Sequence, residues 1–255
     1  MIDLLLRAYA LAERSGALRL PAMEWLFVRS YFAYKRLFED VFARLVRERP
    51  QLFRGGHVVD VGANVGYTAR VFARALQEPY RVYAFEPDPL NFRRLKRFAN
   101  NDRIVPLQSA VGDRDGTIAL WHNDAHPGDH RVVAGDVRSF RGRTNEVPIT
   151  TIDEFARTLA HPIRFVKIDV QGYEPAVLRG MVETLHGDVV VALEFAPEHI
   201  RALGFQPDEV FDLLRGFDIE RLGDESRGYV DLLCTHSSPG PSPSLRPGSG
   251  SPARR

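Results

Sequence analysis

Short apolar β-rich runs alternate with helix-patterned segments between residues 55 and 235, and this alternation is the strongest constraint on the fold. The β-rich runs are His57–Val61, Arg81–Phe85, Ile104–Ser109, Arg164–Val170 and Val189–Phe195, and the helical segments are Tyr67–Gln77, Leu90–Asn100 and Glu174–Leu185. Parallel strands covered on both faces have nearly continuous apolar sequences, as in Val189–Leu193. The pattern predicts an α/β domain with helices on both faces of a mostly parallel sheet.

Two further β-rich runs close this region. Phe217–Leu222 and Tyr229–Thr235 are joined by the turn-rich segment 223–228, which contains two glycines. Adjacent strands with such a short connection favour an antiparallel hairpin. We therefore expect seven strands, with an antiparallel C-terminal hairpin on an otherwise parallel sheet.

The segments that flank this domain have different compositions. Residues 1–54 have helical periodicity, and the aromatic-rich run that begins at Pro21 is amphipathic to about Pro50. We expect a helical N-terminal cap that packs on the domain of residues 55–235, or on a second subunit in a homodimer. A membrane-surface helix is the alternative. Residues 236–255 are rich in Pro, Ser and Gly and are predicted to be a disordered tail.

Composition narrows the class of protein. The formal net charge is +1, which removes the basic excess typical of nucleic-acid binders. No apolar run reaches the roughly 18–20 residues that a membrane span needs. The chain has one cysteine, so it cannot form an internal disulfide, and we expect a reducing, cytoplasmic location.

A glycine-rich turn follows the first β-rich run. Its pattern is Asp60-x-Gly62-x-x-x-Gly66, and a helix is predicted to begin at Tyr67. Glycines permit a sharp turn and a close backbone approach to a ligand, while the N-terminus of a helix offers N–H donors. The next β-rich run ends in Glu86, where a carboxylate can accept hydrogen bonds from ribose hydroxyls. Together these features predict an adenosine-type nucleoside site.

The same turn discriminates between nucleoside ligands. A dinucleotide site has the pattern G-x-G-x-x-G, but Asn64 stands where the middle glycine would be. Asp60 adds a carboxylate, which suits a cationic ligand such as S-adenosylmethionine with its sulfonium and ammonium groups. An NAD-dependent oxidoreductase on the related fold remains an alternative, although no Tyr/Lys hydride-transfer pair is evident.

Several segments resemble the FkbM-type family of S-adenosylmethionine-dependent methyltransferases. They are Val58–Tyr67, Ala84–Pro89 (Ala-Phe-Glu-Pro-Asp-Pro), Val166–Pro175 (Val-Lys-Ile-Asp-Val-Gln-Gly-Tyr-Glu-Pro) and Leu193–Phe195, with shorter likenesses at Ser109–Asp113 and Thr150–Asp153. The resemblance spans about residues 56–222. It implies a Rossmann-like class I methyltransferase fold and methylation of hydroxyl oxygens on sugars, polyketides and other small metabolites.

The resemblance also implies roles for individual residues. Asp60, Gly62, Asn64 and Gly66 would frame the methionine end of the cofactor, Glu86 would hold the ribose, Ser109 and Ala110 would lie at the adenine, and Asp169 would face the transferred methyl group. One position departs from the family pattern, which has Glu where this chain has Gln171. That change removes a carboxylate and puts a role for this position as a base or metal ligand in doubt.

Methyl transfer to a hydroxyl needs alignment of the two reactants and removal of a proton. Strand ends of an open α/β sheet face the ligand crevice, which favours Asp169 and Glu194 as catalytic candidates. Glu174 follows Gly172 at a predicted helix start, where an acid also stabilises the helix dipole, and both interpretations stay open.

The segment Trp121–Arg131 concentrates three histidines. His122, His126 and His130 are four residues apart, but Pro127-Gly128 argues against one helix that would align them. We expect a polar lid over the acceptor, with His130 as a catalytic candidate. A surface loop and a metal site are the alternatives, and we predict no metal ligand although a divalent ion is chemically possible.

The sequence thus predicts an S-adenosylmethionine-dependent O-methyltransferase whose acceptor is a hydroxyl of a small metabolite or glycan. We expect the aromatic N-terminal cap to close the acceptor pocket or to form a homodimer. A non-catalytic protein that retains the cofactor fold is an alternative, for which Gln171 is the one hint. A nucleic-acid methyltransferase is a further alternative, because Arg138, Arg141 and Arg143 form a short basic cluster. A solvated loop explains that cluster equally well.

Overall fold

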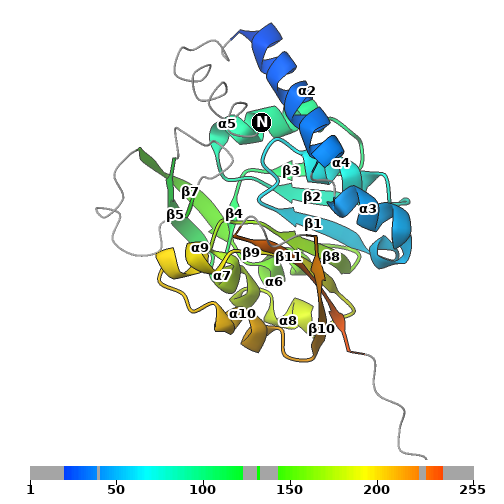
Figure 1. Ribbon diagram of the computed structural model, residues 1–255, viewed down its shortest axis with the longest axis vertical. Helices are drawn as coiled ribbons and strands as arrows, with labels where there is room; N and C mark the ends of the chain where they lie inside the picture. Colours follow the sequence, from blue (N-terminus) through cyan, green and yellow to red (C-terminus); the bar gives the residue numbers. More distant parts are fainter. Residues whose placement is uncertain (1–19, 39–40, 123–130, 133–142, 224–227, 238–255) are drawn as a thin grey trace, which may run out of the picture.

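The computed structural model describes residues 20–38, 41–122, 131–132, 143–223 and 228–237 (Figure 1). Outside these residues lie the first 19 residues of the predicted N-terminal cap, His126, His130 and the tail from residue 238. In the described part of the chain, no helix is both long enough and apolar enough to cross a membrane.

A seven-stranded sheet forms the centre of the molecule, in the order β10-β11-β9-β8-β1-β2-β3. The strands are β1 (His57–Val61), β2 (Val82–Phe85), β3 (Ile104–Leu107), β8 (Ile163–Ile168), β9 (Val190–Phe195), β10 (Phe217–Leu222) and β11 (Val230–His236). Only β11 runs antiparallel to its neighbours, β9 and β10. The structure confirms the predicted sheet with its C-terminal hairpin.

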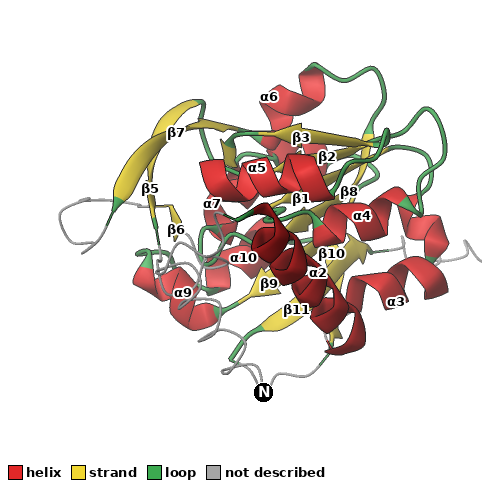
Figure 2. Ribbon diagram, turned by 90° about the horizontal axis from the view of Figure 1, so that it is seen from above, coloured by secondary structure: helices red, strands yellow, loops and turns green. Residues whose placement is uncertain are grey.

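Helices cover both faces of this sheet (Figure 2). One face carries α3 (Val41–Glu48), the 3₁₀ helix η2 (Pro50–Phe53), α4 (Tyr67–Ala73) and α5 (Pro89–Phe98), and the other carries α6 (Ile152–Arg157), α7 (Glu174–Arg179), α8 (Val182–Leu185), α9 (Pro197–Ala202) and α10 (Asp208–Leu213). Alternate strand residues point to opposite faces, so Val58 packs with the first group and Val59 with the second.

The N-terminal helices pack against the first face. Phe53 of η2 stacks on Phe165 of β8 with ring centroids 4.5 Å apart, and Leu45 of α3 is buried in the same cluster. Helix α2 (Pro21–Phe38) is tied to α5 by Glu24, which pairs with Arg94 at 3.1 Å and Arg97 at 2.8 Å. These contacts bring α2 and α3 beside the carboxyl ends of the central strands.

A second sheet, which the sequence did not lead us to expect, follows β3. Its strands are β4 (Ala110–Val111), β5 (Gly116–Trp121), β6 (Arg131–Val132) and β7 (Thr144–Thr150), in the order β4-β7-β5-β6. Proline removes a ladder donor, so Pro148 inside β7 weakens the strand signal there. Ile118, Val147 and Ile149 bury one side of this sheet against the main core.

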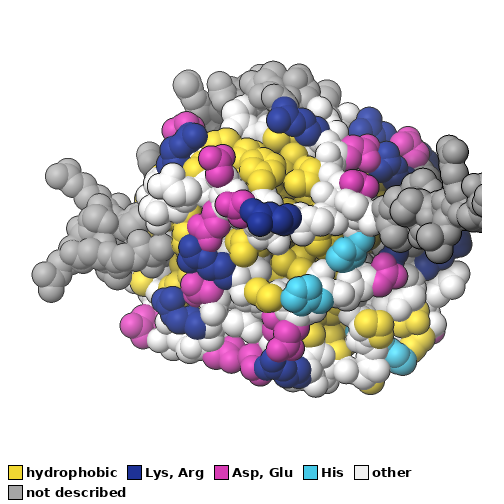
Figure 3. All heavy atoms as spheres, turned by 90° about the horizontal axis from the view of Figure 1, so that it is seen from below, with side chains coloured by type: hydrophobic (Ala, Val, Ile, Leu, Met, Phe, Trp, Pro, Cys, Tyr) yellow, Lys and Arg dark blue, Asp and Glu magenta, His cyan; other side chains and the backbone are white. Residues whose placement is uncertain are grey.

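The face of the molecule seen from below in Figure 3 carries charged side chains of both signs. Figure 3 shows basic and acidic side chains interspersed over the face seen from below. Ion pairs such as Arg201–Glu198 (2.7 Å) in α9 and Arg215–Asp212 (3.0 Å) after α10 are solvent-exposed and contribute little stability.

The helix predicted over Glu174–Leu185 is in fact two helices, α7 and α8, separated at Gly180. A Cβ at Gly180 would lie 1.9 Å from the carbonyl oxygen of Gly112, next to the second sheet. The chain therefore needs glycine here for a close backbone approach, and the turn that accommodates this approach interrupts the helix.

Gly180→Ala should destabilise the fold by about 1–3 kcal/mol, because the added methyl group must displace backbone atoms. Gly187→Ala is the matched control, since its Cβ would meet Thr184 O at 3.2 Å. Urea unfolding followed by circular dichroism measures both changes. Equal stability of the two variants would contradict the close approach at Gly180.

Candidate functional site

A cavity of about 370 Å³ lies at the carboxyl ends of the central strands. Its volume is within the roughly 300–1,000 Å³ typical of small-molecule sites. Seven sequence candidates line it: Gly62, Asn64, Glu86, Ser109, Ala110, Asp169 and Glu194. Helices α2 and α3 add Tyr31, Lys35 and Phe42 to the wall. Segments far apart in the sequence thus meet at one edge of the sheet.

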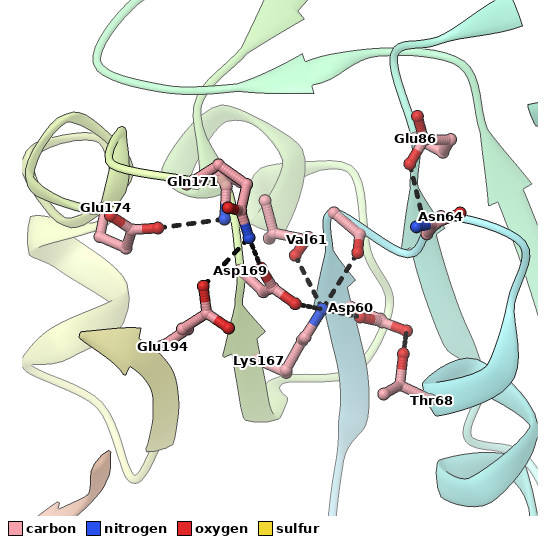
Figure 4. A network of polar contacts seen from close by, with 12 residues as sticks. Asp60, Val61, Asn64, Thr68, Glu86, Lys167, Asp169, Gln171, Glu174 and Glu194 are labelled. Atoms are coloured by element: carbon pink, nitrogen blue, oxygen red, sulfur yellow. Dashed lines mark hydrogen bonds and ion pairs between the residues drawn. The ribbon is translucent and has the colours of Figure 1, made fainter. Parts of the chain in front are cut away.

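The floor of the cavity is organised by Lys167 of β8 (Figure 4). Lys167 is the direct register partner of Asp60 on the neighbouring strand β1. Its Nζ lies 3.2 Å from Asp60 Oδ1 and 3.4 Å from Asp169 Oδ2, and it donates to the carbonyl oxygen of Gly62 at 3.0 Å. One ammonium group therefore fixes the ends of both strands.

The charge on Lys167 is held by its surroundings. Burial lowers the pKa of this ammonium group. The carboxylates of Asp60 and Asp169 raise it by more than burial lowers it, so the net shift is upward. Asp60 is fully buried and its Oδ2 accepts a hydrogen bond from Thr68 Oγ1 at 2.6 Å. The structure thus places the Asp60 carboxylate behind the wall, where its cationic partner is Lys167.

Two glycines of the predicted turn serve packing. Gly62 has φ +76°, and a Cβ there would lie 1.9 Å from the carbonyl oxygen of Asp169, so β1 and β8 approach closely where they end. Gly66 precedes α4 with φ +88°, and its Cβ would lie 2.5 Å from that of Ala99 after α5. Gly62 lines the cavity, whereas Gly66 lets α4 pack on α5.

Glu86, at the end of β2, forms the opposite corner of the cavity. Its Oε2 accepts from the backbone N–H of Asn64 at 2.8 Å, and its Oε1 accepts from that of Asp88 at 2.9 Å. Burial raises the pKa of Glu86 to about 8, although both hydrogen bonds oppose the shift. The carboxyl group can accept a further hydrogen bond from a ligand hydroxyl and, when protonated, can donate one.

Ser109 and Ala110 lie where the chain passes from β3 to the second sheet. The Ser109 hydroxyl donates a hydrogen bond shared between the carbonyl oxygens of Ala110 (2.8 Å) and Pro148 (3.1 Å). Both residues belong to the cavity wall. The second sheet therefore supplies the side of the cavity next to Glu86.

The far end of the cavity is acidic. Gln171 Nε2 donates to Asp169 Oδ1 and to Glu194 Oε1, each at 3.0 Å, so that one amide bridges two carboxyl groups (Figure 4). Burial raises the pKa of Glu194 to about 9, and the charges of Asp169, Glu174 and Asp231 add to the shift. Glu194 therefore holds a proton at neutral pH.

Glu174 lies buried next to the acidic end of the cavity and binds the backbone there. Its Oε1 accepts from the backbone N–H groups of Val170 (3.1 Å) and Gly172 (3.2 Å), and its side chain is buried. Burial raises the pKa of Glu174 to about 7 against these hydrogen bonds. The residue stabilises the loop that carries Gln171.

His122 is a buried link between the second sheet and α5. Its Nδ1 lies 3.1 Å from Asp88 Oδ2, and its Nε2 contacts Asn145. The hydrogen bond to Asp88 raises the pKa of His122 above its ordinary value. Within the described ranges, no three or more His, Cys, Asp or Glu side chains are grouped as a metal site.

The sequence analysis missed the roles of Lys167 and Thr68. Lys167 left one signal, because it is the only charged residue in the apolar stretch from Phe165 to Ile168. A buried strand tolerates such a charge when a partner faces it, and Asp60 ends the parallel strand alongside. The expected N-terminal cap does contribute to the cavity wall, through Tyr31 and Lys35 of α2 and Phe42 of α3.

The sheet order, the antiparallel β11 and the cavity at the strand ends define a Rossmann-like class I methyltransferase fold. The chain belongs to the FkbM methyltransferase domain family, whose profile matches residues 60–230. That match includes both Glu86 and the Asp169–Glu194 end of the cavity.

Two curated relatives are methyltransferases by name. The chain is 31% identical over 163 residues to the hexuronic acid methyltransferase AglP of Haloferax volcanii, covering 61% of this chain and 59% of AglP. It is 26% identical over 177 residues to the 2-O-methyltransferase NoeI of Sinorhizobium fredii, covering 64% and 72% of the two chains. The chain thus spans about three fifths of the length of AglP.

A solved structure shares the fold. The O-methyltransferase of Bacillus cereus, in complex with SAH, superposes with a TM-score of 0.51 at 14% sequence identity. The superposition covers 83% of this chain and 89% of that chain. At this identity the likeness concerns the fold alone.

Lys167→Met should lower the free energy of unfolding by about 3–5 kcal/mol, because Asp60 would be left buried without its cation. The double variant Lys167→Met/Asp60→Asn removes both charges and should recover much of that loss. Urea titration measures the free energy of unfolding of the wild type and of both variants. Equal losses in the single and double variants would contradict the role given to the ion pair.

Stability should also decrease with rising pH. Glu86, Glu174 and Glu194 have an ordinary pKa of 4.5 and folded values of about 8, 7 and 9. Between pH 4.5 and the folded pKa values, the folded state binds more protons than the unfolded state. The contribution of these three groups to stability is therefore complete below pH 4.5 and is lost as the pH rises through 7 to 9.

Melting temperatures measured from pH 6 to pH 9 test this expectation. They should fall with pH in the wild type and fall less in Glu194→Gln. Glu198→Gln, at an exposed position, is the control and should follow the wild type. A melting temperature that rises over this range would contradict the raised pKa values.

Proposed function

We propose that this protein transfers a methyl group from S-adenosylmethionine to a hydroxyl of a sugar or another small molecule. The observation that carries the proposal is the cavity of an FkbM-family domain, with the Glu86 carboxyl at one end and the Asp169–Glu194 pair at the other. The names of AglP and NoeI support a sugar acceptor, because they describe methylation of a hexuronic acid and at a 2-O position.

The residues around the cavity fit a nucleoside cofactor. Glu86 offers acceptor lone pairs to ribose hydroxyls at the end of β2, and Ser109 and Ala110 form the adjoining wall. The turn of Gly62 and Asn64 brings backbone close to the ligand space between Glu86 and Asp169. Bound S-adenosylmethionine would supply an electrophilic methyl group at a sulfonium centre.

The acidic end of the cavity, formed by Asp169 and Glu194, would bind the acceptor hydroxyl and accept its proton. Asp169 is held by Lys167 and Gln171, so its carboxylate is oriented to accept a hydrogen bond, and then the proton, from an acceptor hydroxyl. Glu194 holds its own proton at neutral pH and can donate a hydrogen bond to an acceptor oxygen. His130, outside the described residues, stays a predicted catalytic residue.

Three further assignments stay predictions from the sequence. They are the cytoplasmic location, a homodimer through the N-terminal helices and the absence of a nucleic-acid partner. The single, buried Cys234 supports the first of these, and the small net charge of +1 supports the third.

Calorimetric titration with S-adenosylhomocysteine tests the cofactor. Micromolar binding is expected, with about a tenfold loss in Glu86→Ala, because each hydrogen bond between a neutral carboxyl group and a ribose hydroxyl contributes about 0.5–1.5 kcal/mol. Glu78→Ala, at an exposed glutamate, is the control. Binding of NAD in place of S-adenosylhomocysteine, or of neither ligand, would contradict the proposal.

The variant Asp169→Asn tests the proposed role of Asp169 in methyl transfer. This variant should bind S-adenosylhomocysteine like the wild type but lose methyl transfer across a panel of sugar acceptors, measured as S-adenosylhomocysteine released. Wild-type turnover by Asp169→Asn would remove Asp169 from the mechanism.

A further inference from the structure

Gln171 lies between the two carboxyl side chains of the acidic end. An amide nitrogen carries two hydrogens, and here both are donated, one to Asp169 and one to Glu194, each over 3.0 Å. An uncharged group thus satisfies two acceptors that would otherwise face one another across the cavity wall (Figure 4).

The backbone holds this amide in place. Gln171 has φ +56°, in the left-handed region that residues other than glycine rarely adopt. The flanking N–H groups of Val170 and Gly172 both donate to the buried carboxyl of Glu174. A strained backbone persists only where its surroundings fix it, and such strain occurs mostly at functional sites.

The charges around Glu194 show why a donor is needed there. Lys167 reaches it from β8, Asp231 from β11, Glu174 from α7, and Asp169 from the end of β8. Three of these four groups are acids. Without the amide, both carboxyl groups would lose a hydrogen-bond donor, and nothing would fix the separation of Asp169 and Glu194.

We propose that Gln171 is a positioning residue for methyl transfer, whose amide holds Asp169 and Glu194 at a fixed separation so that both carboxyl groups contact the acceptor. This inference rests on the proposed function. Gln171 itself contacts the two carboxyl groups and acts through them.

Carboxyl ¹³C NMR of glutamate-labelled protein tests the bridge directly, with the Glu194 signal assigned by its loss in Glu194→Gln. Gln171→Met keeps the length of the side chain and removes both donors, and Gln171→Glu is nearly isosteric. In both variants the titration midpoint of Glu194 should move upward, by about one pH unit in Gln171→Met, because a donor to its charged form is lost. Gln77→Met, at an exposed glutamine, is the control and should titrate like the wild type.

Methyl transfer supplies the second readout. Gln171→Met should lose about tenfold or more in kcat, with the KM for S-adenosylmethionine unchanged, because reactant alignment is lost while the cofactor end is intact. A Glu194 midpoint equal to that of Gln77→Met in both Gln171 variants would overturn the proposal, and so would a wild-type kcat in Gln171→Met.

S-adenosylhomocysteine titrations on the same samples separate the two claims. Wild-type protein that binds this ligand, together with an unmoved Glu194 midpoint, would refute the role of Gln171 alone. Wild-type protein that binds no S-adenosylhomocysteine would refute the proposed function, whichever way Glu194 titrates.

Discussion

A single buried ammonium group, that of Lys167, joins the two strands on which the site is built. It neutralises Asp60 at the end of β1, approaches Asp169 at the end of β8, and donates to the Gly62 carbonyl in the turn between them. Because a buried charge is tolerated only when it is paired, the three groups depend on each other. The position of Asp169 in the cavity follows from this arrangement.

The two ends of the cavity differ in their chemistry. At the β2 end, Glu86 is held by backbone N–H groups, which leaves lone pairs for ligand hydroxyls. At the β8–β9 end, carboxyl groups are held by side chains, namely Lys167 and Gln171. Backbone donors suit a constant cofactor, whereas side-chain donors can change with the acceptor. The division supports a two-ligand site along one sheet edge.

The sequence was sufficient to predict the main sheet, because each of its strands is a separate β-rich run bounded by turn residues. It also identified Glu86, Asp169 and Glu194, since acids that end parallel strands converge at one edge. It could not reveal that Asp60 faces Lys167, because strand register is set by tertiary packing. The second sheet was hidden by Pro148, and the bridge made by Gln171 depends on one backbone angle.

The most direct test of the account is a crystal structure of the protein with S-adenosylhomocysteine bound. We expect the ribose hydroxyls at the Glu86 carboxyl group and the sulfur directed toward Asp169 and Glu194. Lys167 should keep its contacts with Asp60 and Gly62. A nucleoside bound outside the cavity, or with its ribose at the Asp169 end, would contradict the division of the site proposed above.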